Sequence, residues 1–114
     1  MVSREQLLAP PALVQEPVEC PGLGTLIVRE LTQAEFAEFI ASLETTGGRP
    51  FDPRYGLKLL GRCAIDETGA RLLHDDDVET LGRWKVGVLA PAIAAADRLN
   101  GISAPAIQSA EKNS

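Results

Sequence analysis

Aromatic side chains are scarce in this sequence, which contains one tryptophan, one tyrosine and three phenylalanines in 114 residues. Hydrophobic residues still make up 45% of the chain, which is typical of a globular protein and not of a disordered one. The core must therefore be built mainly from aliphatic side chains. A chain of this length fits one domain, and such a domain can bury a core without disulfides or a structural metal.

Cysteines are few, and there is no long hydrophobic run. Cys20 and Cys63 lie far apart and form neither a CxxC motif nor a zinc-binding spacing. The most apolar stretch, residues 86–96, contains Pro91 and is too short to cross a bilayer. Charged residues at positions 4 and 5 interrupt any secretory segment after the first methionine. We therefore expect free, buried thiols, a reducing cytoplasm and no membrane partner.

Positive charge is also limited. The formal net charge is -5, and no cluster of lysine or arginine occurs. Nucleic-acid binding normally requires a basic face that neutralises phosphates, so we predict no nucleic-acid partner. The acid is concentrated in residues 1–50, which hold seven acidic and three basic residues. Such a surface is either simply solvated or steers a basic partner.

Histidine occurs once, at His74, directly before Asp75, Asp76 and Asp77. Imidazole and carboxylate groups are metal ligands, so this stretch raises the question of a metal site. A calcium loop that began at Asp75 would need glycine at its sixth position and glutamate at its twelfth, where the sequence has threonine and valine. A zinc site would need a second histidine or a cysteine nearby. We therefore predict no metal site and no cofactor.

Sequence motifs of catalysis are similarly lacking. There is no GxSxG motif, and the PGLG segment lacks the spacing and the lysine of a phosphate-binding loop. Cys63 and His74 could form a nucleophile and its base. However, Cys63 falls on the apolar stripe of a predicted helix, which favours a packed thiol. We predict no catalytic residues and no enzymatic activity, with a small Cys/His enzyme as an alternative.

The N-terminal part of the chain predicts a β-hairpin followed by a helix. Residues 14–30 contain two strand-like segments on either side of the turn sequence PGLG, and Pro17 in the first favours an edge strand. Thr32 and Glu35 then form a T-x-x-E capping box. Apolar residues recur at helical spacing after this box, so a helix is expected over residues 33–44.

The rest of the chain predicts three more helical segments, over residues 55–65, 75–81 and 84–100. The glycine-rich residues 45–53 are expected to form a flexible loop, and residues 103–114 a mobile C-terminal tail.

Two features of the last helices are less simple to interpret. Asp75 is expected to be the N-cap, with the next two aspartates in the first turn, and Gly101 supplies a left-handed C-cap. Pro91 either kinks the last helix or starts a new one. The fold class is therefore α+β, mainly α with a small N-terminal hairpin. We expect three to four helices packed in one compact domain of residues 1–102.

The order of these segments resembles that of the small tail assembly chaperones of long-tailed, non-contractile bacteriophages. The stretches that carry the resemblance are VECPGLGTLIVRELTQAEFAEF, RCAIDETGARLLHDDDVETLGRW and AADRLNGIS. They contain the hairpin and capped helix, an acidic-Gly turn followed by an acidic D-x-D-x-E-x-L-G segment, and a closing R-L-N-G. Pro91 and the alanine-rich final helix depart from the pattern.

The resemblance implies a non-enzymatic role in virion assembly. Such a chaperone binds the tape measure protein, keeps this long helical rod soluble and helps recruit the tail tube protein. It acts in the host cytoplasm and is absent from the mature virion. Weak self-association along the rod is a further hypothesis. A structural virion component or a general protein-interaction adaptor is the main alternative.

The resemblance carries over no binding residues. From their apolar character and expected exposure, we select Trp84, Val86 and Leu89 as candidate partner-binding residues. Trp84 is either a core residue or a recognition anchor.

Overall fold

The computed structural model describes residues 1–46, 49–50 and 52–101. Its N-terminal hairpin consists of β1 (Gln15–Cys20) and β2 (Gly24–Arg29), which pair antiparallel as predicted. Pro21 and Gly22 occupy the centre of a turn closed by the bond from the Leu23 N–H to the Cys20 carbonyl. The positive φ of Gly22 (80°) is the value that a type II turn requires at this position.

A third strand, β5 (Ala64–Ile65), extends the hairpin into an antiparallel sheet with the order β1-β2-β5. The prediction that the second helix continues to Ile65 is therefore wrong, because α3 (Tyr55–Cys63) ends two residues earlier. Ala64 has an extended backbone and pairs with Val28, which is completely buried. β1 remains at the sheet edge, as Pro17 predicts, where a residue without an N–H is tolerated.

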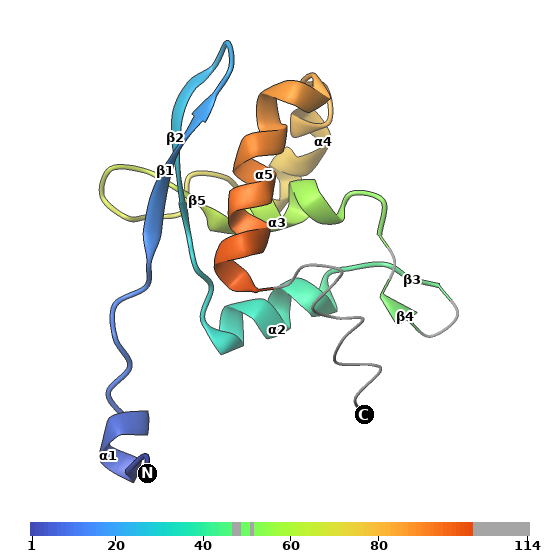
Figure 1. Ribbon diagram of the computed structural model, residues 1–114. Helices are drawn as coiled ribbons and strands as arrows, with labels where there is room; N and C mark the ends of the chain where they lie inside the picture. Colours follow the sequence, from blue (N-terminus) through green and yellow to red (C-terminus); the bar gives the residue numbers. More distant parts are fainter. Residues whose placement is uncertain (47–48, 51, 102–114) are drawn as a thin grey trace.

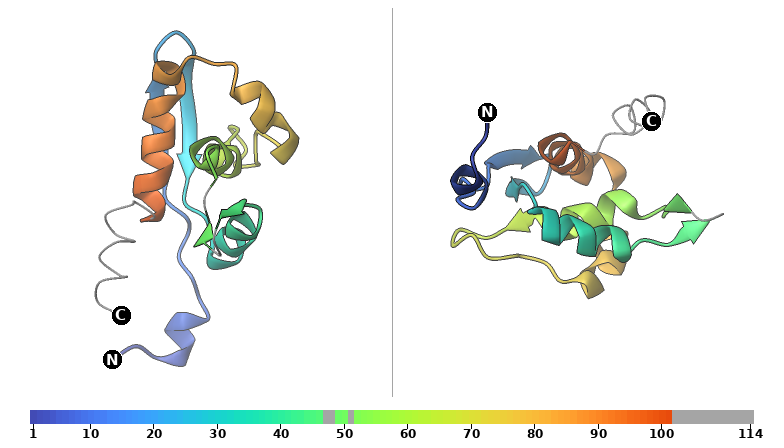
Figure 2. Two further views of the ribbon diagram at one scale, coloured as in Figure 1. Left: turned by 90° about the vertical axis from the view of Figure 1, so that its right-hand side faces the viewer. Right: turned by 90° about the horizontal axis from the view of Figure 1, so that it is seen from below.

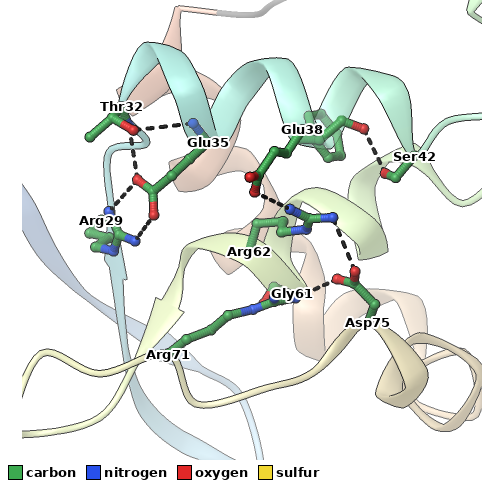
Figure 3. Close-up of polar contacts among 10 residues, drawn as sticks. Arg29, Thr32, Glu35, Glu38, Ser42, Gly61, Arg62, Arg71 and Asp75 are labelled. Atoms are coloured by element: carbon green, nitrogen blue, oxygen red, sulfur yellow. Dashed lines mark hydrogen bonds and ion pairs between the residues drawn. The ribbon is translucent and has the colours of Figure 1, made fainter.

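Helix α2 (Gln33–Ala41) begins at the predicted capping box. The Thr32 hydroxyl accepts from the Glu35 N–H at 3.1 Å, and the Glu35 carboxylate accepts from the Thr32 N–H at 2.9 Å. Arg29 donates two hydrogen bonds to the same carboxylate and thereby lowers the pKa of Glu35 to about 2 (Figure 3). The helix ends three residues before the predicted boundary.

The segment predicted as a flexible loop contains two short paired strands, β3 (Thr45–Thr46) and β4 (Arg49–Pro50). Residues 47, 48 and 51 of that segment lie outside the described residues, as does the predicted tail. Asp52 is buried just before α3. It accepts from the N–H groups of Glu44 and Arg54 and pairs with Lys58, whose hydrogen bond lowers the pKa of Asp52 to about 2.

Residues 75–100 are largely helical. The short 3-10 helix η1 (Asp75–Asp77) continues into α4 (Val78–Leu81), and α5 (Val86–Asn100) follows after a four-residue link. Pro91 lies inside α5, so it does not start a helix. Gly101 has the predicted left-handed conformation, with a φ of 64°.

The described residues form an α+β fold with more helices than the three to four predicted. They contain five α-helices and the 3-10 helix. One of them, α1 (Arg4–Leu7), has no buried residue and lies away from the body of the molecule (Figure 1). Among the described residues, no helix has the length and apolar character needed to cross a membrane.

Helix α5 lies against the hairpin and also packs across α3 (Figures 1 and 2). Its buried residues are Leu89 and three small ones, Ala92, Ala95 and Ala96, which allow close approach. The core beneath it is mainly aliphatic, as the composition predicts, and its largest fully buried side chains are Phe39, Leu59, Leu60, Val28 and Cys63.

Asn100 joins the end of α5 to the connection between β2 and α2. Its Oδ1 atom accepts from the Leu31 N–H at 2.7 Å. Its Nδ2 atom donates to the Ala96 carbonyl at 2.8 Å and to the Cys63 sulfur at 3.5 Å. The contacts with Leu31 and Cys63 join residues far apart in sequence, so they hold α5 in place over the rest of the fold.

Candidate functional site

An apolar groove runs along the N-terminal part of α5. It has a volume of about 490 Å³, and its walls come from the start of α3, the end of α4, the link between α4 and α5, and α5 itself. In Figure 1, α5 has the hairpin along one side and the start of α3 and α4 on the other. The lining is formed by Tyr55, Leu57, Leu81, Gly82, Trp84, Lys85, Val86, Leu89, Ala90, Ile93, Ala94 and Asp97.

All three residues selected from the sequence line this groove, but their exposure differs. Trp84 is 45% exposed and Val86 is 87% exposed, so both present apolar surface to solvent. Leu89 is only 4% exposed and belongs to the hydrophobic core. Leu89 therefore forms part of the floor, whereas Trp84 and Val86 stand at the rim, where a partner can touch them.

The opposite wall was not identified from the sequence. Tyr55 and Leu57 come from α3, some thirty residues before the link that carries Trp84. The face of α5 does carry a local signal, because Val86, Ala90 and Asp97 recur at helical spacing. That signal shows which residues share a face, but it does not show which helix lies beside them.

The groove carries one acidic group within its apolar lining. The Oδ1 atom of Asp97 is buried and has no hydrogen-bond partner among the described residues. Burial raises the pKa of Asp97 above its usual value. Burial, with a smaller effect from Asp97, also raises the pKa of Tyr55 to about 12. Lys85 lies at the other end of the groove, just before α5 begins.

The groove wall is closely packed where α3 meets α5. A Cβ atom added to Gly56 would lie 2.9 Å from the Cγ2 atom of Ile93, which is closer than a normal van der Waals contact. Gly61, one and a half turns further along α3, has room, because its Cβ would lie 3.8 Å from Val78. Both glycines lower the helix propensity of α3, but only Gly61 has room for a methyl group.

We expect Gly56→Ala to lower the free energy of unfolding by about 1 kcal/mol. Overpacking costs about 1–3 kcal/mol and exceeds the gain of up to about 1 kcal/mol in helix propensity. Gly61→Ala is the matched control and should be neutral or stabilising by about 0.5–1 kcal/mol. Urea denaturation of both variants measures the difference. If Gly56→Ala were as stable as Gly61→Ala, this result would contradict the close packing of Gly56 against Ile93.

The acidic stretch that suggested a metal site has a structural role instead. The prediction that Asp75 is the N-cap is wrong, because the N-cap is His74 and the carboxylate of Asp77 accepts from its N–H at 2.8 Å. Asp75 turns to Arg71 and Arg62, at 2.6 and 3.0 Å. These hydrogen bonds and charges lower its pKa.

Figure 3 shows that Arg62 also reaches Glu38 of α2, at 3.7 Å, so the ion pairs connect α2, α3 and η1. The sequence around Asp75 does not reveal the link to α2 and α3, because Arg62 comes from α3 and lies thirteen residues before Asp75. Within the described part of the chain, no group of three or more histidine, cysteine or acidic side chains is arranged to hold a metal.

Replacing Asp75 and Asp77 separately should distinguish the two roles. Each alanine variant is expected to lose about 1 kcal/mol, Asp75→Ala through its ion pairs and Asp77→Ala through the cap. Because salt screens exposed charges, the loss in Asp75→Ala should shrink in about 1 M salt, whereas that in Asp77→Ala should largely persist. Asp76→Ala is the control, since Asp76 is exposed. Equal salt dependence of the two losses would contradict this assignment.

The two residues of the alternative enzyme hypothesis lie in different surroundings. Cys63 is completely buried in α3, and burial raises the pKa of its thiol to about 11. A nucleophilic cysteine instead requires a lowered pKa and access to substrate. His74 is exposed at the start of η1. Cys20 is also buried, and both cysteines are free, as expected.

The groove therefore provides a surface on which a partner can bind. It offers an apolar surface with two exposed anchors, Trp84 and Val86, and a charged group near each end. Comparison of this chain with models of protein families, with curated proteins and with solved structures finds no match.

Proposed function

We propose that this protein is a tail assembly chaperone of a long-tailed, non-contractile bacteriophage. It binds the tape measure protein, keeps it soluble and promotes assembly of the tail tube. The proposal starts from the resemblance of three ordered stretches, whose landmarks include the PGLG turn, the capping box at Thr32 and the closing R-L-N-G. The observation that carries it is the apolar groove beside α5, with Trp84 and Val86 exposed at its rim.

An apolar groove of this kind supports the chaperone role for a physical reason. Apolar surface that is left exposed on a small domain marks an interaction site, and an exposed tryptophan is a common anchor of such sites. A tape measure protein is a long helical rod, and the groove is lined by helices. Weak binding repeated along the rod would let tail tube subunits displace the chaperone.

Co-expression with the tape measure protein of the same phage tests the proposal. We expect the wild-type chain to keep the tape measure protein in the soluble fraction and Val86→Asp to lose most of this effect. Val86 is almost fully exposed, so the substitution should leave the fold intact. Val2→Asp is the matched control, because Val2 is also exposed but lies outside the groove.

Two results would overturn the proposal. One is a tape measure protein that remains insoluble with the wild-type chain. The other is the presence of this chain in stoichiometric amount in purified virions, which would favour a structural component. If solubility is rescued equally by wild type and Val86→Asp, the chaperone function stands but the groove is not its binding surface.

A further inference from the structure

We infer that the groove beside α5 binds an amphipathic helix that places a lysine or arginine against Asp97. The inference rests on the proposed function only in treating the groove as the binding site, and it specifies the chemistry of the partner segment. It follows from three features of the groove: its helical walls, its exposed small residues and a carboxylate with one buried oxygen atom that has no hydrogen-bond partner among the described residues.

The walls favour a helix over an extended strand. Among the described residues, those that line the groove belong to helices or to the link between α4 and α5, and none of them is in a strand whose free edge could pair with an extended peptide. The backbone N–H and C=O groups of a bound strand would therefore lose water without gaining partners, which is unfavourable. A helix satisfies its backbone internally and can press an apolar face into the groove.

The length and the side chains of the groove also fit a helix. From Lys85 to Asp97 the groove follows α5 for twelve residues, which corresponds to about 18 Å, or somewhat more than three helical turns. Ala90 and Ala94 are exposed along this line, so a second helix can approach closely. Trp84 and Val86 then provide the larger apolar contacts at one end.

Asp97 determines the charge of the partner. Its Oδ1 atom is buried without a partner, and the carboxylate lies beside apolar groups such as Ile93. A buried polar atom without a partner is costly, so a basic side chain that paired with this oxygen at this end of the groove would relieve that cost. Lys85 at the other end would repel a partner that is basic along its whole length. The fitting helix therefore carries its basic residue at one end of an apolar face.

A double-mutant cycle with synthetic peptides tests the inference. The first peptide is a helix without tryptophan, with leucines at i, i+4 and i+7 and one lysine at the end of that face. The second has glutamine in place of the lysine. Trp84 is the single tryptophan of the chain and lies in the groove, so its fluorescence reports binding directly.

We expect wild type to bind the lysine peptide about tenfold more tightly than the glutamine peptide, as measured for charge pairs at interfaces. Asp97→Asn keeps the shape of the side chain and should abolish this difference. Asp76→Asn, at an exposed position outside the groove, should preserve it. Equal affinity of wild type for both peptides, an unchanged preference in Asp97→Asn, or no binding of either peptide would overturn the inference.

The same measurements separate this inference from the proposed function. Rescue of the tape measure protein by wild type, lost in Val86→Asp, together with no lysine preference, would overturn only the assigned partner chemistry. Sedimentation without peptide tests a second copy of this chain as the occupant. A concentration-dependent dimer that is lost in Val86→Asp and excludes the lysine peptide would replace the proposed helix with that second copy.

Discussion

Replacing Phe39 with alanine is expected to lower the free energy of unfolding by about 3–5 kcal/mol. Phe39 is completely buried at the centre of a core that contains few aromatic residues. Its ring lies 5.4 Å from that of Tyr55 and 6.2 Å from that of Phe36, measured between centroids. It thus joins α2 to the start of α3. Phe39 is the buried residue of α2, so no other buried side chain of this helix can move in to fill the cavity.

This loss is a large part of the total free energy of unfolding, because a domain of this kind is stable by about 5–15 kcal/mol. Urea denaturation followed by circular dichroism measures it. Phe36→Ala is the control, because Phe36 lies three residues earlier on the same helix but is only partly buried, and it should lose clearly less. If Phe39→Ala lost less than Phe36→Ala, the packing of α2 on Tyr55 would have to be revised.

The effect should extend to the groove because Tyr55 is shared. Its ring packs on Phe39 on one side, and the residue lines the groove on the other. Loss of the Phe39 ring therefore removes support from the α3 wall. Leu89, which was chosen for its apolar character, belongs to the same hydrophobic core and therefore forms the floor of the groove and not an exposed anchor.

Local signals in the sequence predict much of the fold. The capping box of Thr32 and Glu35, the turn at Pro21 and Gly22, and the C-cap at Gly101 depend on residues a few positions apart, and each is present as predicted. Boundaries that depend on distant segments are missed. Ala64 and Ile65 continue a helical pattern, but pairing with β2 draws them into an extended strand.

The same distinction applies to the candidate site. Trp84 and Val86 could be selected from one stretch of sequence because they lie two residues apart, just before and at the start of α5. The α3 wall could not be predicted without knowing how α3 packs against α5. The importance of Gly56 likewise becomes clear only when Ile93 is seen to lie opposite it. Similarly, an aspartate at a helix start predicts a cap, but Asp75 lies beside Arg62 and Arg71, and ion pairing takes precedence. A long-range contact therefore decides among roles that are equally consistent with local pattern.

Replacing Asn100 with alanine should lower the free energy of unfolding by about 2 kcal/mol, although Asn100 lies in the last turn of α5. The Leu31 N–H would lose its acceptor in a part-buried position, and an unsatisfied group of this kind costs about 1–3 kcal/mol. The hydrogen bonds to Ala96 and Cys63 would also be lost. Asn100 thus belongs to the small set of polar side chains whose removal affects the whole domain.

Two comparisons give this prediction its specificity. Arg98→Ala removes an ion pair with Glu16 from the same turn of α5, but Arg98 is 62% exposed, so the loss should be about 0–1 kcal/mol. Hydrogen exchange of the Leu31 amide should accelerate in Asn100→Ala and remain near the wild-type rate in Arg98→Ala. An unchanged Leu31 rate in Asn100→Ala would mean that this amide has another acceptor. In that case α5 would be held over the sheet by its alanine face and not by Asn100.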